Sequence, residues 1–130
     1  MFSHVVVGSN DLEKAKRFYD AALGALGIGE GRIDKNGTRP RYVYRTPTAT
    51  FFVTEAIDGQ LATHANGGTI GFTCQSTDEV DRWHAAGVAH GGESIENPPG
   101  WRGPQVGGFY LAYLRDPDGN KLCAVYRQPT

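Results

Sequence analysis

Two stretches of sequence decide the fold: HVVVGSNDLEKAKRFYDAA at residues 4–22 and TIGFTCQSTDEVDRWHAAG at residues 69–87, an offset of 65 positions. Each stretch begins with a short apolar run typical of a strand and passes through a polar break. Each then ends in a segment whose apolar residues recur every three to four positions, which predicts an amphipathic helix. The match pairs Phe18 with Trp83, and it predicts an internal repeat of two modules in one chain.

Both predicted helices begin at a capping signal. Asn10 with Glu13 has the spacing of a capping box, and Ser76 with Glu79 is the box itself. The three-to-four spacing predicts which side chains each helix buries. We expect the first helix to bury Leu12, Ala15, Phe18, Tyr19, Ala22 and Leu23, and the second to bury Val80, Trp83 and Gly87.

The second part of each half also repeats, now at an offset of 70. RTPTAT at residues 45–50 matches RDPDGN at residues 115–120, and both are rich in turn residues. Strand-like runs flank each turn, and a shorter strand precedes each group. The predicted strands are 31–34, 41–44 and 51–54 in the first half and 93–95, 109–114 and 122–126 in the second. The Gly- and Pro-rich stretch 96–108 is typical of a loop.

Each half is therefore predicted to be a βαβββ module. One helix covers one face of a small sheet, and a second module is the simplest cover for the other face. We predict an α+β fold in which two paired βαβββ modules form a cup-shaped mixed sheet. The chain would be a single domain, residues 1–130, with module one at about 1–60 and module two at about 66–130. Such a cup is the natural ligand site.

Composition excludes several classes of function. The 13 basic and 14 acidic residues leave a formal net charge of −1, and the basic residues are scattered, so we expect neither nucleic acid nor membrane as a partner. The apolar runs, such as residues 5–7 and 109–114, are too short for a transmembrane helix. No signal peptide is evident, and the two cysteines form no disulfide framework, so the expected location is cytoplasmic.

The opening HVVV…DLEKA…FY…LG, residues 4–24, and the ending YLRDPDGNKL, residues 113–122, resemble the two modules of the vicinal oxygen chelate superfamily. This superfamily includes glyoxalase I, extradiol dioxygenases and bleomycin-resistance proteins. The resemblance covers essentially the whole chain, and it implies paired βαβββ modules in a homodimer. It leaves open whether the chain is an enzyme, either a glyoxalase-like lyase or a relative of the dioxygenases.

The resemblance also implies four inward-facing positions that hold a divalent metal in the family. In this sequence they are His4, Thr69, Cys123 and, by the offset of 70, Val53. Only His4 and Cys123 are good ligands, whereas catalytic metal sites generally use three protein ligands. The metal site is therefore degenerate, and the sequence favours no metal cofactor. A divalent ion held by His4 and Cys123 stays the alternative.

Other residues complete the expected pocket for a small-molecule ligand. Trp101 and Arg102, within the predicted loop, resemble a lid that stacks on and pairs with a planar or anionic ligand. Tyr113 lies at a position that faces the substrate in the fosfomycin-resistance branch. A Cys123–His4 pair could also act as a metal-free nucleophile. Each of these residues could instead be structural: Cys123 as a small buried apolar side chain, and Trp101 as a plug in a dimer contact.

Overall fold

The computed structural model describes residues 1–103 and 108–129. Its first module forms sheet 1, with strand order β1-β4-β3-β2, and its second forms sheet 2, with strand order β5-β8-β7-β6. The first-module elements are β1 (His4–Gly8), α1 (Leu12–Gly24), β2 (Arg32–Asp34), β3 (Arg41–Arg45) and β4 (Thr50–Thr54). The second-module elements are β5 (Ile70–Thr73), α2 (Thr77–Ala89), β6 (Glu93–Arg102), β7 (Phe109–Arg115) and β8 (Lys121–Arg127).

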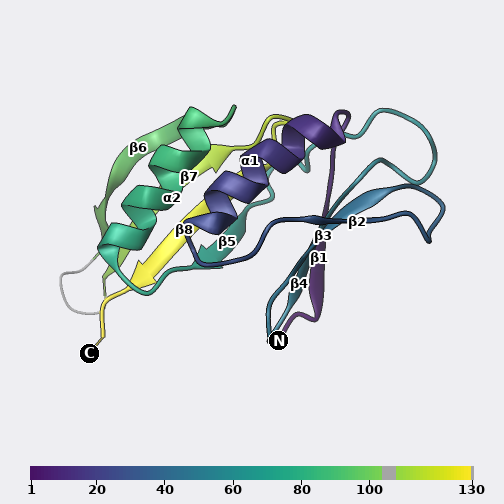
Figure 1. The fold of residues 1–130 in the computed structure, drawn as a ribbon. Coiled ribbons are helices and arrows are strands. Elements are labelled where there is room, and N and C mark those ends of the chain that lie inside the picture. The colour runs from purple at the N-terminus through teal and green to yellow at the C-terminus, as the bar shows by residue number, and fades with distance from the viewer. Residues whose placement is uncertain (104–107, 130) are drawn as a thin grey trace.

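Both modules have the same mixed topology. The first strand of each module pairs in parallel with the last, β1 with β4 and β5 with β8, and the remaining pairs are antiparallel. The helix is the crossover that a parallel pair requires. The α+β class and the paired βαβββ modules are thereby confirmed (Figure 1).

The helix starts follow the capping chemistry, with one correction. Ser76 caps α2, and its side chain accepts a hydrogen bond from the Glu79 backbone N–H. The N-cap of α1 is Asp11, not Asn10: the Asp11 carboxylate accepts from the Lys14 N–H. The Asn10 side chain instead pairs with both backbone groups of Ala62, at 2.7 and 3.0 Å. The sequence pattern could not show this long-range contact, which competes for Asn10.

A single core joins the two modules. Helices α1 and α2 lie side by side (Figure 1), and their predicted apolar residues are buried, with Leu12 half-buried at its edge. The Phe51 ring of sheet 1 meets the Phe72 ring of sheet 2 edge to face, with centroids 5.5 Å apart. The face of each sheet that meets the helices is called its helix-covered face, and the other is called its open face.

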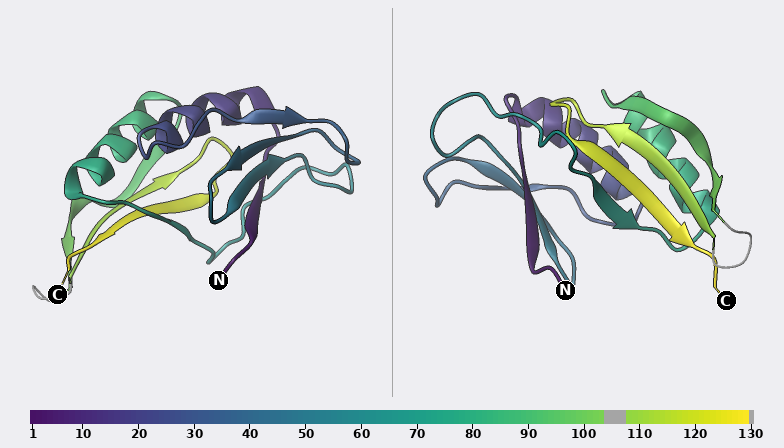
Figure 2. Two further views of the ribbon diagram at one scale, coloured as in Figure 1. Left: turned by 60° about the horizontal axis from the view of Figure 1, so that its bottom comes forward. Right: turned by 180° about the vertical axis from the view of Figure 1, so that it is seen from behind.

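The two open faces point in different directions. In the right-hand view of Figure 2, the strands of sheet 2 lie in front of the helices while sheet 1 turns away beside them. The helix-covered faces of both sheets contribute to the shared core. Among the described elements, the closest backbone approach between the modules is that of α1 to α2, and the sheets themselves form no shared hydrogen-bonded ladder. One chain therefore does not enclose the predicted cup between its two sheets.

A polar turn ties the modules together. The buried Asp116 carboxylate accepts a 2.5 Å hydrogen bond from the Tyr19 hydroxyl of α1. The Asn120 side chain donates to Asp116 and to the Gly8 carbonyl at the end of β1, at 2.8 and 3.0 Å. The Asp-Pro-Asp-Gly-Asn turn thus fixes β8 against the first module.

The stretch predicted as a loop is largely a strand. β6 runs from Glu93 to Arg102, where the sequence predicted only residues 93–95. Its pairing with β7 shifts register between Ile95 and Gly100, so the residues between them form a bulge. Such a bulge accommodates Pro98 and Pro99 within an edge strand. The rest of the predicted loop, residues 104–107, lies outside the described residues.

Candidate functional site on the open faces

Cys123 lies at the centre of the open face of sheet 2. Its register partners are Gly71 on β5 and Tyr113 on β7. Cys123 is only 5% exposed, yet it is not part of the shared core, because Leu122 and Ala124 alternate with it toward α2. Burial raises the pKa of Cys123, and the neighbouring Tyr113 hydroxyl opposes this shift only in part. Cys123 is therefore a protonated thiol at neutral pH.

Two charged residues that sequence reasoning missed accompany Cys123. Lys121 lies over the Tyr113 ring, with its ammonium 5.0 Å from the ring centroid, and it forms an ion pair with Glu96. Strand alternation could have identified Lys121, since it precedes Cys123 by two positions. Sequence alone gave no signal for Glu96, because only the bulge of β6 brings it to this face.

His4 lies on the open face of sheet 1. Its ring meets the Phe52 ring edge to face at 5.9 Å, and Nδ1 lies 2.6 Å from the Ser3 hydroxyl. The Arg41 guanidinium stacks over the same Phe52 ring at 4.2 Å and pairs with Asp34 at 3.0 Å. This face therefore presents an aromatic ring between two cationic or ionisable side chains.

The prediction that Val53 lines the cup with His4 is wrong. Val53 is 1% exposed and belongs to the core on the helix-covered face, where it pairs with Val7. The offset of 70 is wrong by one residue at this point, and a shift of one residue moves a side chain to the other face of the sheet. The β4 residue on the open face beside His4 is Phe52. Thr69 is exposed and precedes β5. It lines a groove of about 250 Å³ that also contacts Val6 and Lys121.

Trp101 does not form a lid over Cys123, whereas Arg102, the register partner of Phe109, lies on the open face by strand alternation. Trp101 packs against Tyr110 and Tyr126, with centroids at 5.3 and 6.2 Å. Tyr110 bonds Asp81 of α2, so this cluster lies on the helix-covered side. The Arg102 guanidinium donates to three backbone carbonyls of the bulge, those of Asn97, Pro98 and Gly100. Arg102 thus stabilises the bulge.

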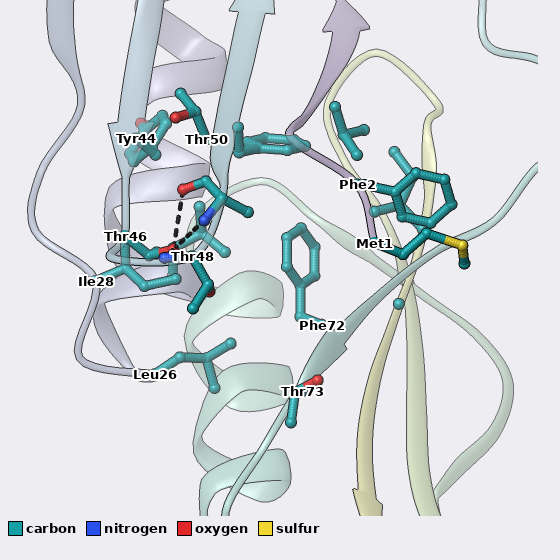
Figure 3. A pocket seen from close by; sticks show the side chains of 16 residues that line it. Met1, Phe2, Leu26, Ile28, Tyr44, Thr46, Thr48, Thr50, Phe72 and Thr73 are labelled. Carbon is teal, nitrogen blue, oxygen red and sulfur yellow. Dashed lines mark hydrogen bonds between the residues drawn. The ribbon is translucent and has the colours of Figure 1, made fainter.

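A separate apolar pocket of about 450 Å³ lies between the modules (Figure 3). Leu26 and Ile28 after α1, Phe72 on β5 and the threonines of the β3–β4 turn line it. Its lining contains no Asp, Glu, Lys, Arg or His and none of the predicted site residues. This pocket therefore offers apolar contact and hydroxyl groups, and no acid–base or metal chemistry.

The donors at the family's metal positions do not fit a metal site within one chain. His4 and Cys123 lie on different sheets, Thr69 is a weak donor and Val53 has none. Across residues 1–103 and 108–129, no three His, Cys, Asp or Glu side chains gather closely enough to hold a metal ion. A catalytic metal generally needs three protein ligands.

None of the described helices has the length and apolarity to span a membrane.

Comparisons with known proteins place this geometry in a family. Residues 1–124 match the family model of the Glyoxalase/Bleomycin resistance protein/Dioxygenase superfamily. A glyoxalase/bleomycin resistance protein from Albidiferax ferrireducens T118 is 59% identical in a crystal structure, with a TM-score of 0.91 over 98% of this chain and 99% of that one. A putative glyoxalase from Bacillus halodurans, 21% identical, shares the fold with a TM-score of 0.73 over 97% and 95% of the two chains.

One curated relative extends the comparison. A protein from Brassica oleracea var. gemmifera named "Putative lactoylglutathione lyase" is 26% identical over 130 residues, which is 99% of this chain. The chain spans only 45% of that relative's length. The match across residues 1–124 is the decisive one. The chain therefore belongs to the glyoxalase/bleomycin resistance protein/dioxygenase superfamily.

Proposed function

We propose that the protein binds a small organic molecule at its open faces without a complete metal site. The observation that carries this proposal is the donor set: of the four family metal positions, only His4 and Cys123 supply good ligands, and they lie on different sheets. Small side chains such as Gly71 and Thr73 on β5 leave space over the sheet beside Cys123. Ligand binding needs that space and no metal.

Charge on the open faces narrows the ligand class to anions. By strand alternation, the open faces carry more basic than acidic side chains, although the chain's formal net charge is −1. The basic residues are Arg32, Arg41, Arg45, Arg102, Arg115, Lys121 and Arg127, and the acidic residues are Asp34, Glu93 and Glu96. A cationic surface attracts an anionic ligand and speeds its association.

A second copy of the chain completes the site in this proposal. The open faces diverge within one chain, so each needs a facing surface to enclose a ligand. The open face of one chain's sheet 1 against sheet 2 of a partner would bring His4 opposite Cys123. The two free thiols are compatible with the cytoplasmic location that we propose for this homodimer.

The alternative is a metal-dependent lyase of the glyoxalase I type. The Brassica oleracea relative favours it by name. His4 and Cys123 would then hold a divalent ion across the partner interface, with water completing its coordination. The bound ion would polarise the substrate carbonyl as a Lewis acid.

An activity assay separates the two. The purified protein is supplied in turn with Ni, Zn, Mn and Fe and offered a hemithioacetal substrate, beside a His4→Ala variant. Our proposal expects turnover no faster than in the His4→Ala variant under any metal. Metal-dependent turnover that the His4→Ala substitution abolishes would establish the lyase instead.

A further inference from the structure

Glu96 has an unusual backbone conformation. Its φ is +59°, and among the described residues it is the one non-glycine residue with a positive φ. This left-handed region costs an ordinary residue about 1–2 kcal/mol. Non-glycine residues held there, like bulges in edge strands, occur preferentially beside functional sites. Contacts around Glu96 must therefore stabilise this backbone conformation.

Arg102 stabilises the bulge that contains Glu96 through hydrogen bonds to the backbone. Its guanidinium donates to the Gly100 carbonyl at 2.8 Å and to the Asn97 and Pro98 carbonyls at 3.0 Å each. These three hydrogen bonds stabilise the bulge at residues 96–99, which have no register partner on β7. The bulge leaves Glu96 free of a register partner on β7, so its side chain can reach across to Lys121 of β8.

Lys121 is held between two groups on the open face. Its ammonium forms an ion pair with the Glu96 carboxylate and lies 5.0 Å from the Tyr113 ring centroid. The Lys121 and Glu96 side chains are 27% and 47% exposed, so solvent and ligands reach both. A partly exposed ion pair of this kind contributes little net stability, and a second carboxylate can replace the first at low cost.

We propose that Lys121 is the anion-recognising residue of the open face of sheet 2, and that Glu96 occupies the ligand's place in the free protein. The inference rests on the proposed function and names its ligand class: a small molecule with a carboxylate on a planar apolar body. The carboxylate replaces Glu96 on the Lys121 ammonium. The planar body lies over the small residues Gly71 and Thr73 beside Cys123.

The test follows Lys121 directly, with benzoate as the anionic probe and benzamide as its neutral counterpart. Side-chain NMR signals of the lysines are recorded during each titration in low salt. Lys16 is the matched internal control: it is also ion-paired, with Asp20 at 2.5 Å, and lies 5.7 Å from the Tyr42 ring centroid, but on α1. Benzoate is expected to shift the Lys121 signal saturably and to leave Lys16 unmoved.

Two variants sharpen the result. Glu96→Gln removes the internal competitor and is expected to tighten benzoate binding about two- to fivefold. Lys121→Met keeps the side-chain length and is expected to weaken benzoate at least about tenfold while leaving benzamide unchanged. An unchanged benzoate affinity in Glu96→Gln, or an equal loss of benzamide binding in Lys121→Met, overturns the inference.

Backbone signals separate this inference from the proposed function. If the amides of Thr73 and Val125 respond to benzoate while Lys121 does not, the open face binds ligands but Lys121 does not recognise them. If neither responds to benzoate or benzamide, the result counts against both. A Lys121 response with the expected variant order supports both.

Discussion

At the scale of single residues, burial decides the chemistry of the open face. Cys123 lies at a position where the family has a metal ligand, but it is almost fully covered, and burial raises its pKa. Cys74, in the core on the other side of the same sheet, has a pKa raised by burial to about 12. A thiol must ionise to act as a nucleophile. Neither cysteine therefore supports covalent catalysis in the ligand-free chain.

Alkylation of Cys123 is expected to be slow. Iodoacetamide at neutral pH should modify it more slowly than it modifies free cysteine, because the raised pKa leaves little thiolate and the side chain is 5% exposed. Mass spectrometry of the time course measures the rate, and a Cys74→Ala variant isolates the Cys123 signal. A rate faster than that of free cysteine would instead support the hypothesis that Cys123 acts as a metal-free nucleophile.

Asp20 makes stability depend on pH. Burial raises the pKa of Asp20, but hydrogen bonds from the Gly31 N–H, Lys16 and Tyr44 outweigh it, and the pKa falls below its ordinary value of 3.8. Because the folded pKa lies below the unfolded one, this contribution is complete above about pH 4 and is lost as pH falls through the folded pKa.

We therefore expect Asp20→Asn to be less stable than the wild type at neutral pH, with the difference shrinking below about pH 4. Urea unfolding at several pH values measures it. Asp78→Asn is the matched control, because Asp78 also pairs at i,i+4, with Arg82, but at a more exposed site. A constant difference for Asp20→Asn across the pH range would contradict this assignment.

At the scale of elements, the sequence predicted well where periodicity is local. The buried positions of both helices follow from three-to-four spacing, since each helix packs one stripe against its own sheet. The strand β6 could not be predicted beyond residue 95, because Pro98, Pro99 and Gly100 are typical of loops. Hydrogen bonds from Arg102 to the bulge, and pairing with β7, override that local preference.

Helix packing gives the element-scale prediction. A Cβ on Gly87 would clash with Leu114 Cδ1 and lie 3.1 Å from Phe18 Cε1 of α1, so Gly87→Ala is expected to destabilise the fold by about 1–3 kcal/mol. Gly24→Ala, at the end of α1, meets no atom within 4 Å and is expected to be neutral or to stabilise by up to about 1 kcal/mol.

Chemical denaturation of the two variants measures these free energies of unfolding. Equal effects at Gly87 and Gly24 would mean that α2 does not pack as closely against Leu114 of β7 and Phe18 of α1 as the structure shows. A large loss at Gly87 alone would support the close packing of α2 against Leu114 of β7 and Phe18 of α1.

At the scale of the whole molecule, the repeat predicted two modules but not their relative orientation. An internal offset compares one module with the other and carries no information on the contacts between them. Those contacts come from residues far apart in sequence, such as Phe51 with Phe72 and Asn120 with Gly8. They direct the open faces apart, and so His4 and Cys123 do not share a cup within one chain.

Because the open faces diverge within one chain, we expect that a charged residue introduced on an open face disrupts the proposed homodimer. The wild type is expected to have twice the 14.1 kDa chain mass in light scattering. Val6→Asp on the open face of sheet 1, where Val6 is 48% exposed, is expected to be a folded monomer. Val88→Asp on α2, at a site 46% exposed, is the control and should stay dimeric. A dimeric Val6→Asp variant would contradict the expected interface.

Metal content tests the central claim most directly. The claim is that the positions of His4, Val53, Thr69 and Cys123 form no complete divalent site, and that the protein binds an organic ligand instead. Elemental analysis after incubation with Ni, Zn, Mn or Fe and exhaustive dialysis measures ions retained per chain. We predict a content well below one ion per chain for every metal. One tightly retained divalent ion per chain, lost in His4→Ala, would contradict the account.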